Sequence, residues 1–381
     1  MTNPFVYGEV VPLSAFVDRE DELDRLTRDL MAGQKVFLIS PRRYGKSSLI
    51  AQALRAAARG GALVVDLTVS SYSSYVAFLE GYARALSSIE RQTGRAVSWL
   101  REALASVRPE VRLETSDRGR PEVSLSFPSA RTERDAARLA NEVFALPGRI
   151  ADKRGRKVAV ALDEFQAIAG FDGGSVEHAL RAAVQHQRNV GYVFSGSEPA
   201  LMERMLGRNR PFYKAGPVMR LGRIPAERFA AFLEARFHST SIKPAQGLGL
   251  AIVELAGNLP YDVQRLAHEL WDDARAGARR SVGLDDLHST LTRLLGEQES
   301  IFEATWQRLT LAQRAALRAA VLQEGRELLS ADTRTRYRLS GASTVQASLA
   351  ALVREDILAR DGDRYIVVDS LLREWVARRT F

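Results

Sequence analysis

The segment with the clearest chemical signature is Ser40–Ser48, which runs Ser-Pro-Arg-Arg-Tyr-Gly-Lys-Ser-Ser. It fits the P-loop pattern G-x-x-x-x-G-K-[ST], except that Ser40 stands where the first glycine is usual. Free backbone N–H groups and a helix N-terminus bind phosphate oxygens, because both offer unpaired donors and positive partial charge. In such a loop Gly45 allows close approach, Lys46 reaches the terminal phosphates and the Ser47 hydroxyl binds Mg²⁺. The other expected nucleotide contacts in the loop are Arg42, Arg43, Tyr44 and Ser48.

Two carboxylates follow the apolar run Val158–Leu162, which predicts a buried strand. A phosphate-binding loop works with an acid at the end of a nearby strand, because Mg²⁺ prefers oxygen ligands. We therefore expect Asp163 to bind the metal, directly or through water, and Glu164 to polarise the attacking water as general base. The alternative is an exposed acidic pair that only ends a strand.

A third polar group follows the apolar residues Tyr192–Phe194, where the chain continues Ser195-Gly196-Ser197. Ligands of open α/β sheets gather at the carboxyl ends of the strands. Ser197 is therefore a candidate catalytic contact to the γ-phosphate, and Ser195 is the other candidate. The alternative is that these serines are turn residues, which strand ends commonly carry.

The elements that position these residues alternate between strands and helices. We expect buried strands at 35–39, 62–67, 157–162 and 191–195, and helices at 47–58, 74–89, 132–146 and 176–188. This alternation predicts an α/β fold with a parallel sheet covered on both faces. A β-hairpin insertion is expected at about 108–130, where apolar and polar residues alternate around a turn. Its Arg112, Arg118 and Arg120 are candidate contacts, and the alternative is a hairpin that only extends the sheet edge.

The pattern changes beyond Arg220, where no further strands are expected until the tail. Helices at 225–237, 248–256, 261–276 and 284–295 predict a helical lid subdomain. From about Trp306, three helical patterns precede a hairpin at 357–368 that turns at Asp361-Gly362, which is the plan of a winged helix. The expected domains are 1–222, 223–300 and 301–381.

Composition narrows the class of protein. The 381 residues are 46% hydrophobic and 26% charged, which is typical of globular domains. There is no cysteine, so thiolate metal sites and disulfides are excluded, and the five histidines lack metal-binding spacing. No secretory signal or membrane-spanning run is visible, so we expect a soluble, cytoplasmic protein without membrane partners. The net charge of +8 permits nucleic-acid binding, but charge alone favours the alternative, a soluble surface rich in arginine and glutamate.

The motifs together resemble the archaeal-type ATPases of the STAND branch, relatives of the AAA+ superfamily. The resemblance rests on four segments: Phe16–Leu23 with its Phe-Val-Asp-Arg-Glu start, the Ser40–Ser47 loop, Leu162–Phe165 and Ser195–Ser197. Gly257-Asn-Leu-Pro260 is similar to the glycine-x-proline motif of that group's lid. The chain departs from the family at Pro211–Ala215, where Pro-Phe-Tyr-Lys-Ala replaces the usual Pro-Leu-Tyr-Gly-Arg.

The resemblance implies a slow, Mg²⁺-dependent ATPase with a P-loop sheet, a lid and a C-terminal winged helix. It makes Val17 and Arg19 candidate contacts on the adenine side. Pro260 and Arg265, at the start of a lid helix, are expected to report the nucleotide state. An arginine finger is also implied, and Arg204, Arg208 and Arg210 have suitable places in the chain.

Two functions of different classes remain open. One is a nucleotide-driven conformational switch, with the winged helix as an intramolecular clamp or a contact for a protein partner or a second copy. The other is a DNA-binding ATPase that loads or remodels a nucleoprotein complex. The predicted third helix of the winged helix presents Thr344, Gln346, Ala347 and Ala350 outward, and Arg334, Arg336 and Arg338 precede it. The wing turn Asp361–Asp363 is acidic, which disfavours phosphate contact there.

Overall fold

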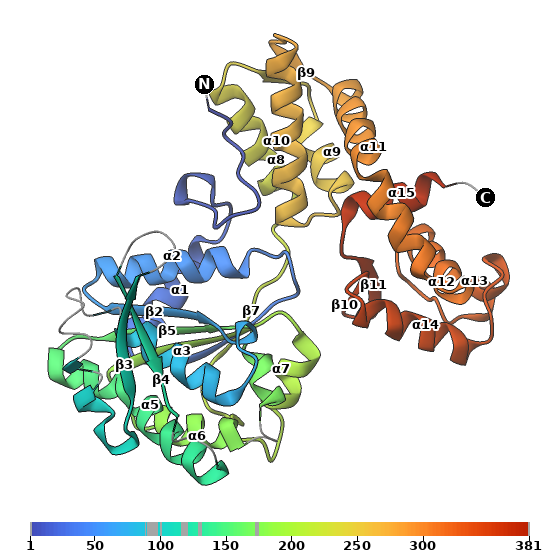
Figure 1. Cartoon of the computed structure of the whole chain (residues 1–381). Coiled ribbons are helices and arrows are strands. Elements are labelled where there is room, and N and C mark those ends of the chain that lie inside the picture. Colours follow the sequence, from blue (N-terminus) through green and yellow to red (C-terminus); the bar gives the residue numbers. More distant parts are fainter. Residues whose placement is uncertain are drawn as a thin grey trace. The chain divides into compact units, whose positions relative to one another are not determined.

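The computed structural model describes residues 2–87, 89, 98–99, 101–115, 121–128, 132–171 and 175–379. The chain divides into two compact units (Figure 1). The sheet unit comprises Arg19–Ser40 and Lys46–Gly222. The helical unit comprises Met1–Asp18, Pro41–Gly45 and Arg223–Phe381.

The sheet unit is built on five parallel strands. Their order is β2 (Leu63–Thr68), β5 (Val158–Asp163), β6 (Val190–Gly196), β1 (Lys35–Ile39) and β7 (Val218–Arg220). The four predicted strands are confirmed. β1, β5 and β6 lie inside the sheet and their apolar runs are buried almost throughout, as internal parallel strands require, whereas the edge strand β2 is buried in part. β7 was not predicted, since three residues carry too little pattern to be recognised.

Helices cover both faces of this sheet. In Figure 1, α1 (Glu20–Met31) and α2 (Lys46–Arg59) lie on one face. The other face carries α3 (Tyr75–Ser87), α5 (Glu133–Arg154) and α6 (Ser175–Val184). The short helices η2 (Val69–Ser71), η3 (Ala105–Val107), η4 (Phe165–Gly170) and α7 (Pro199–Met205) lie in connecting segments of this unit. The short helix η1 (Leu13–Ala15) belongs to the helical unit.

One helix is longer than its sequence predicted. We expected it to stop at Leu146, ahead of Pro147, but α5 continues through the proline to Arg154. A proline inside a helix removes one hydrogen bond and costs ~3 kcal/mol. Here Pro147 is itself buried, and Ile150 and Ala151 beyond it reach the core, so burial of the second half of the helix offsets that loss.

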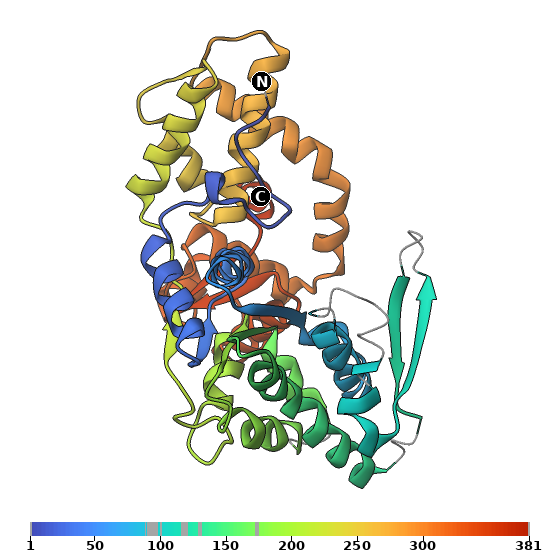
Figure 2. The same ribbon diagram turned by 90° about the vertical axis from the view of Figure 1, so that its left-hand side faces the viewer.

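The predicted hairpin insertion forms its own two-stranded sheet. β3 (Glu110–Thr115) and β4 (Pro121–Ser126) pair antiparallel, and Figure 2 shows them next to α3. Val111 and Leu125 are buried in the core that α3 shares. Arg112 is exposed and pairs with Glu110, while Arg118 and Arg120 lie outside the described residues.

The helical unit starts with a four-helix group: α8 (Ala226–Ser239), α9 (Leu248–Leu255), α10 (Pro260–Ala276) and α11 (Leu284–Arg308). The expectation that no strand follows Arg220 before the tail is wrong in detail. β8 (Lys243–Pro244) and β9 (Ser281–Val282) pair in parallel, a two-residue ladder that leaves no periodic signal in the sequence. α11 runs beyond the predicted end at Leu295, because Phe302 and Trp306 continue its buried stripe.

The tail forms the predicted three helices and hairpin: α12 (Leu311–Leu322), α13 (Ala331–Arg336), α14 (Ala342–Arg354), β10 (Leu358–Asp361) and β11 (Arg364–Val367). A final helix, α15 (Ser370–Arg378), was not predicted. Its Trp375 packs against Trp306 of α11 and donates a hydrogen bond to Glu299. The tail therefore shares a continuous hydrophobic core with α11.

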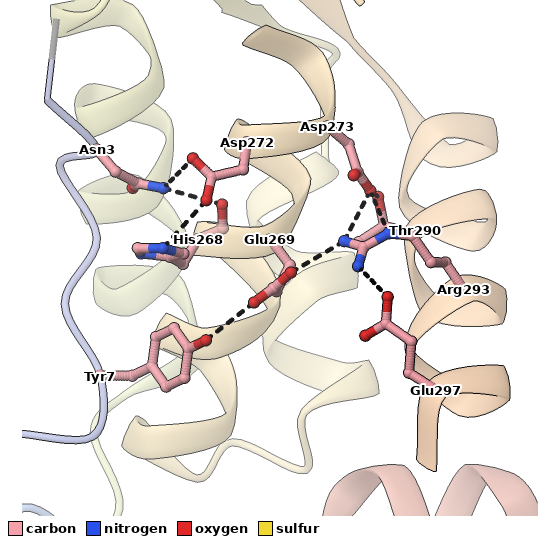
Figure 3. A network of polar contacts seen from close by, with 9 residues as sticks. All are labelled: Asn3, Tyr7, His268, Glu269, Asp272, Asp273, Thr290, Arg293 and Glu297. Atoms are coloured by element: carbon pink, nitrogen blue, oxygen red, sulfur yellow. Dashed lines mark hydrogen bonds and ion pairs between the residues drawn. The ribbon is translucent and has the colours of Figure 1, made fainter. Parts of the chain in front are cut away.

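The N-terminal segment is bound along α10 by side-chain hydrogen bonds (Figure 3). The Asn3 amide donates to the carbonyl of His268 at 3.0 Å and to the Asp272 carboxylate at 2.9 Å. The Tyr7 hydroxyl donates to Glu269 Oε1 at 2.9 Å, and burial together with that bond raises the pKa of Tyr7 to about 12. These bonds place residues 2–7 in the helical unit rather than against the sheet.

The same helix is joined to α11 by one arginine. Arg293 contacts Glu269 at 2.9 Å, Asp273 at 3.1 Å and Glu297 at 2.7 Å, and Thr290 donates to Asp273 at 2.7 Å (Figure 3). Glu269 therefore accepts bonds from the N-terminal segment and from α11 at once. This shared carboxylate links three parts of the helical unit.

We predict that Tyr7→Phe lowers the unfolding free energy by about 1 kcal/mol, because a hydrogen bond to an ionised carboxylate is lost without loss of apolar packing. The measurement is the thermal transition of the full chain. The matched control is Tyr213→Phe, which alters an exposed tyrosine of the sheet unit. A Tyr7→Phe variant as stable as the wild type would contradict the assigned bond.

Candidate active site

The phosphate-loop motif lies between β1 and α2, as its pattern requires. β1 ends at Ile39, Ser40 is fully buried, and α2 begins at Lys46. Gly45 has φ +86° and open space where a Cβ would stand, a backbone conformation that suits glycine. The first N–H groups of α2 have no partner within the helix, so its N-terminus can receive an anion.

Lys46 lies between the two predicted carboxylates. Its side chain is only 6% exposed, and its Nζ is 3.1 Å from both Asp163 Oδ1 and Glu164 Oε1. Asp163 ends β5 and Glu164 follows it with φ +51°, an uncommon left-handed conformation for a residue with a side chain. The structure thus brings the loop lysine and both acids to one point at the carboxyl edge of the sheet.

The expected magnesium ligands also meet. The Ser47 hydroxyl donates to Asp163 Oδ2 at 3.2 Å. A hydroxyl and a carboxylate are the hard oxygen donors that suit Mg²⁺, which keeps several waters and takes phosphate oxygens as its other ligands. Within the described ranges, no group of three or more His, Cys, Asp or Glu could hold a metal ion by itself. The donor set therefore fits a metal that arrives together with phosphates.

Ser195, near the end of β6, and Ser197, just beyond it, each donate to a different one of the two acids. Ser195 donates to Asp163 Oδ1 at 2.5 Å, and Ser197 donates to Glu164 Oε2 at 2.6 Å. Gln166 of η4 also donates to Glu164 Oε2, at 2.5 Å. Sequence analysis missed Gln166; the available signal was an amide two residues after the acid pair, within an otherwise apolar stretch.

Opposing effects set the charge of both acids. Burial raises the pKa of Asp163, but the Lys46 ammonium and the Ser195 hydroxyl together hold it below its usual value. Burial likewise raises the pKa of Glu164, and Lys46, Ser197 and Gln166 outweigh it. Both carboxylates are therefore ionised at neutral pH, as a metal ligand and a general base require.

The predicted adenine-side residues lie in different units. Val17 is buried in the hydrophobic core of the helical unit. Arg19 belongs to the sheet unit, where its guanidinium bonds Glu22 at 2.9 Å and the Gly222 carbonyl at 2.5 Å. Ser48, the last residue of the motif, is half-buried in the first turn of α2.

Three loop side chains are engaged inside the helical unit, with which residues 41–45 are grouped. Arg42 pairs with exposed Asp356 at 2.5 Å, and Arg43 contacts the buried Asp262 at 3.2 Å. The Tyr44 hydroxyl accepts from Arg223 at 3.3 Å. Sequence analysis did not single out these three partners, because nothing in their local pattern distinguishes them from surface charges.

The two predicted lid residues lie on α10. Pro260 is its first residue, in agreement with the predicted helix start. Arg265 lies beside the side-chain amide of Gln298 on α11.

Two of the arginine-finger candidates lie at a cavity of the sheet unit. Arg204 and Arg210 border this cavity of about 260 Å³ together with Gln166 and Glu177. Lys214 lies over the ring of Tyr213.

Burial raises the pKa of Asp262 to about 6, with nearby Asp369 adding to the rise and Arg43 opposing it. This pKa lies above the pKa of an aspartate in the unfolded chain, so the folded protein holds the Asp262 proton more tightly. The resulting contribution to the free energy of unfolding is fully present below about pH 4 and is lost as pH rises through about 6. The wild type should thus lose on the order of 3 kcal/mol across this window at this residue.

We therefore predict that Asp262→Asn becomes more stable relative to the wild type as pH rises from about 4.5 to 7.5. Chemical denaturation at several pH values measures the difference. Asp356→Asn, which removes an exposed carboxylate from the same unit, is the matched control. A stability difference between Asp262→Asn and wild type that stays constant with pH would contradict the raised pKa.

Comparison with known proteins supports this description of the fold. Residues 300–378 match the family described as "Probable winged helix domain". The chain is similar to a Walker-type ATPase of Pyrococcus abyssi, at 17% identity and a TM-score of 0.61, over 97% of this chain and 99% of that one. A search of the curated proteins found no match. No helix in the described part of the chain is long and apolar enough to cross a membrane.

Two proteins of Aeropyrum pernix share the fold as well. The ORC2 protein, solved in ADPNP–ADP complexes, is 17% identical with a TM-score of 0.54, over 99% of this chain and 96% of that one. The ORC1 protein, solved in complex with DNA, is 14% identical with a TM-score of 0.52, over 96% and 94%. The chain therefore shares the fold of these three proteins, with the predicted winged helix at its C-terminal end.

Proposed function

We propose that the chain binds ATP with Mg²⁺ at the Ser40–Ser48 loop and hydrolyses it slowly. The observation that carries this proposal is the meeting of Lys46, Asp163 and Glu164 at the carboxyl edge of a parallel sheet, beside a helix N-terminus. Two ionised acids around a single buried lysine leave one excess negative charge, which suits a site completed by a divalent cation and phosphates.

Each residue then has a defined task. The loop backbone and Lys46 bind the phosphates, and Ser47 and Asp163 would hold Mg²⁺, which neutralises phosphate charge when bound. Glu164 orients the attacking water and accepts its proton. Ser197, which follows β6, donates to Glu164 and so keeps that carboxylate in place after β5. Because catalysis here is positioning and electrostatics, small displacements of these groups change the rate strongly.

The slow turnover suits a nucleotide-driven conformational switch. A switch requires a contact that differs between ATP and ADP, since a ligand shifts an equilibrium only by its differential affinity for the two states. The lid residues Pro260 and Arg265 are proposed to provide that difference, and the winged helix to transmit it to a partner. The fixed helix start at Pro260 supports a rigid lid.

We predict that Lys46→Ala loses ATP binding, because the motif's only ammonium group is removed. Glu164→Gln should bind ATP with unchanged affinity and slow hydrolysis by about 10²-fold or more. Calorimetry and phosphate release measure the two effects, and exposed Lys153→Ala is the control for the loss of a lysine. Retained affinity in Lys46→Ala would refute the phosphate contact; wild-type turnover in Glu164→Gln would place the base elsewhere.

A second candidate function is a DNA-binding ATPase that loads or remodels a nucleoprotein complex. The matched winged helix favours it, because α14 exposes Thr344, Gln346, Ala347 and Ala350 as predicted. Gln346 can pair with adenine, and the exposed Arg336 and Arg338 can meet phosphates.

The two functions differ in how the ATPase responds to duplex DNA. DNA stimulation that depends on phosphate contacts weakens steeply as salt rises, whereas a switch driven by nucleotide alone shows none. We predict no stimulation, measured as ATPase rate with and without duplex DNA at about 50 and 200 mM salt. Stimulation that Arg336→Ala and Arg338→Ala together remove would instead establish the DNA-binding function.

A further inference from the structure

Three side chains contact the Glu164 carboxylate, and one of them, Gln166, belongs to none of the predicted motifs. Lys46 approaches Oε1 at 3.1 Å, whereas Ser197 and Gln166 both donate to Oε2. In the proposed function, the Lys46 charge serves the phosphates. Ser197 and Gln166 then remain as the groups that orient Glu164.

The position of Gln166 depends on a glycine in the neighbouring strand. A Cβ at Gly196 would lie 2.7 Å from Gln166 Oε1 and 2.4 Å from the Met202 side chain, both closer than real Cβ contacts. Gly196 does not have a positive φ, so its backbone conformation does not require glycine. The space for the Gln166 amide and Met202 does require it.

Burying the Gln166 amide costs free energy, which packing alone does not explain. The side chain is 7% exposed, and its Oε1 has no hydrogen-bond partner among the described residues. A buried polar atom without a partner costs about 1–3 kcal/mol. A leucine of similar size avoids that cost, so the amide is explained by what its Nε2 donates to and not by packing.

We infer that Gln166 is a positioning residue that occupies Glu164 Oε2 and so leaves Oε1 as the oxygen that acts as base. Gln166 does not touch the nucleotide or the water; it acts through Glu164. The inference rests on the proposed function and names a residue that decides how well the base is aligned. Misalignment by about 1 Å at such a position lowers rates by up to 10²-fold.

Two variants of similar side-chain size separate the hydrogen bond that Gln166 donates to Glu164 from the packing of the Gln166 side chain. Gln166→Leu keeps the volume without polar atoms, and Gln166→Glu keeps the shape but replaces the donor by an acceptor. Gln166 borders a cavity of about 260 Å³, which offers space next to either variant side chain. We expect both to lower kcat by about tenfold or more while KM and the Kd for MgATP stay within about twofold, because the phosphate contacts are unchanged.

The matched control is Gln187→Leu, which removes a structural amide of the same unit that bonds Phe144 and Tyr192. It should lower the thermal transition and leave kcat unchanged. If Gln166→Leu left kcat unchanged while Glu164→Gln lowered it, the inference would be wrong and the proposed function would stand.

A measurement without nucleotide tests the bond itself. The side-chain NH₂ signal of Gln166, identified by its absence in Gln166→Leu, should lie downfield in the wild-type ¹H–¹⁵N spectrum and return to the ordinary amide region in Glu164→Ala. A signal unmoved by Glu164→Ala overturns the inference whatever the ATPase rate. Another outcome is that the bond is intact while Glu164→Gln hydrolyses ATP as fast as the wild type. That result overturns the proposed function, and with it the positioning role of Gln166.

Discussion

The site depends on one buried ammonium group. Lys46 is almost fully enclosed and compensates two carboxylates that would repel each other without it. Removing a charge from water is costly unless it is paired, so this cluster holds the end of β5 close to the start of α2. Ser47, Ser195, Ser197 and Gln166 donate their hydrogen bonds to the same two carboxylates.

Strand order explains why distant residues meet there. β6 lies between β1 and β5, so the loop after β1, the serines after β6 and the acids after β5 share one edge of the sheet. Parallel strands give this edge a common direction, which a chain alternating strand and helix produces automatically. Gly196 has no side chain, and the Gln166 amide occupies the space that a Cβ at this position would need, next to the acids.

The helical unit obeys a different constraint: its parts are joined by a continuous apolar core and by shared carboxylates. Trp306 and Trp375 join α11 to α15, and Glu269 accepts bonds from Tyr7 and Arg293. Asp262 receives Arg43 and the backbone N–H of Ser370. A buried carboxylate that serves two segments makes the positions of those segments depend on each other.

The sequence by itself determined the class of fold and the motif residues, because buried strands, a glycine–lysine–serine turn and an acid pair are local patterns. It also placed the winged helix, whose helices and hairpin carry their own periodicity. Only tertiary structure decided the course of α5 past Pro147, the pairing of the two-residue strands β8 and β9, and the roles of Gln166 and Asp262. These features depend on what a segment is buried against, which no local pattern records.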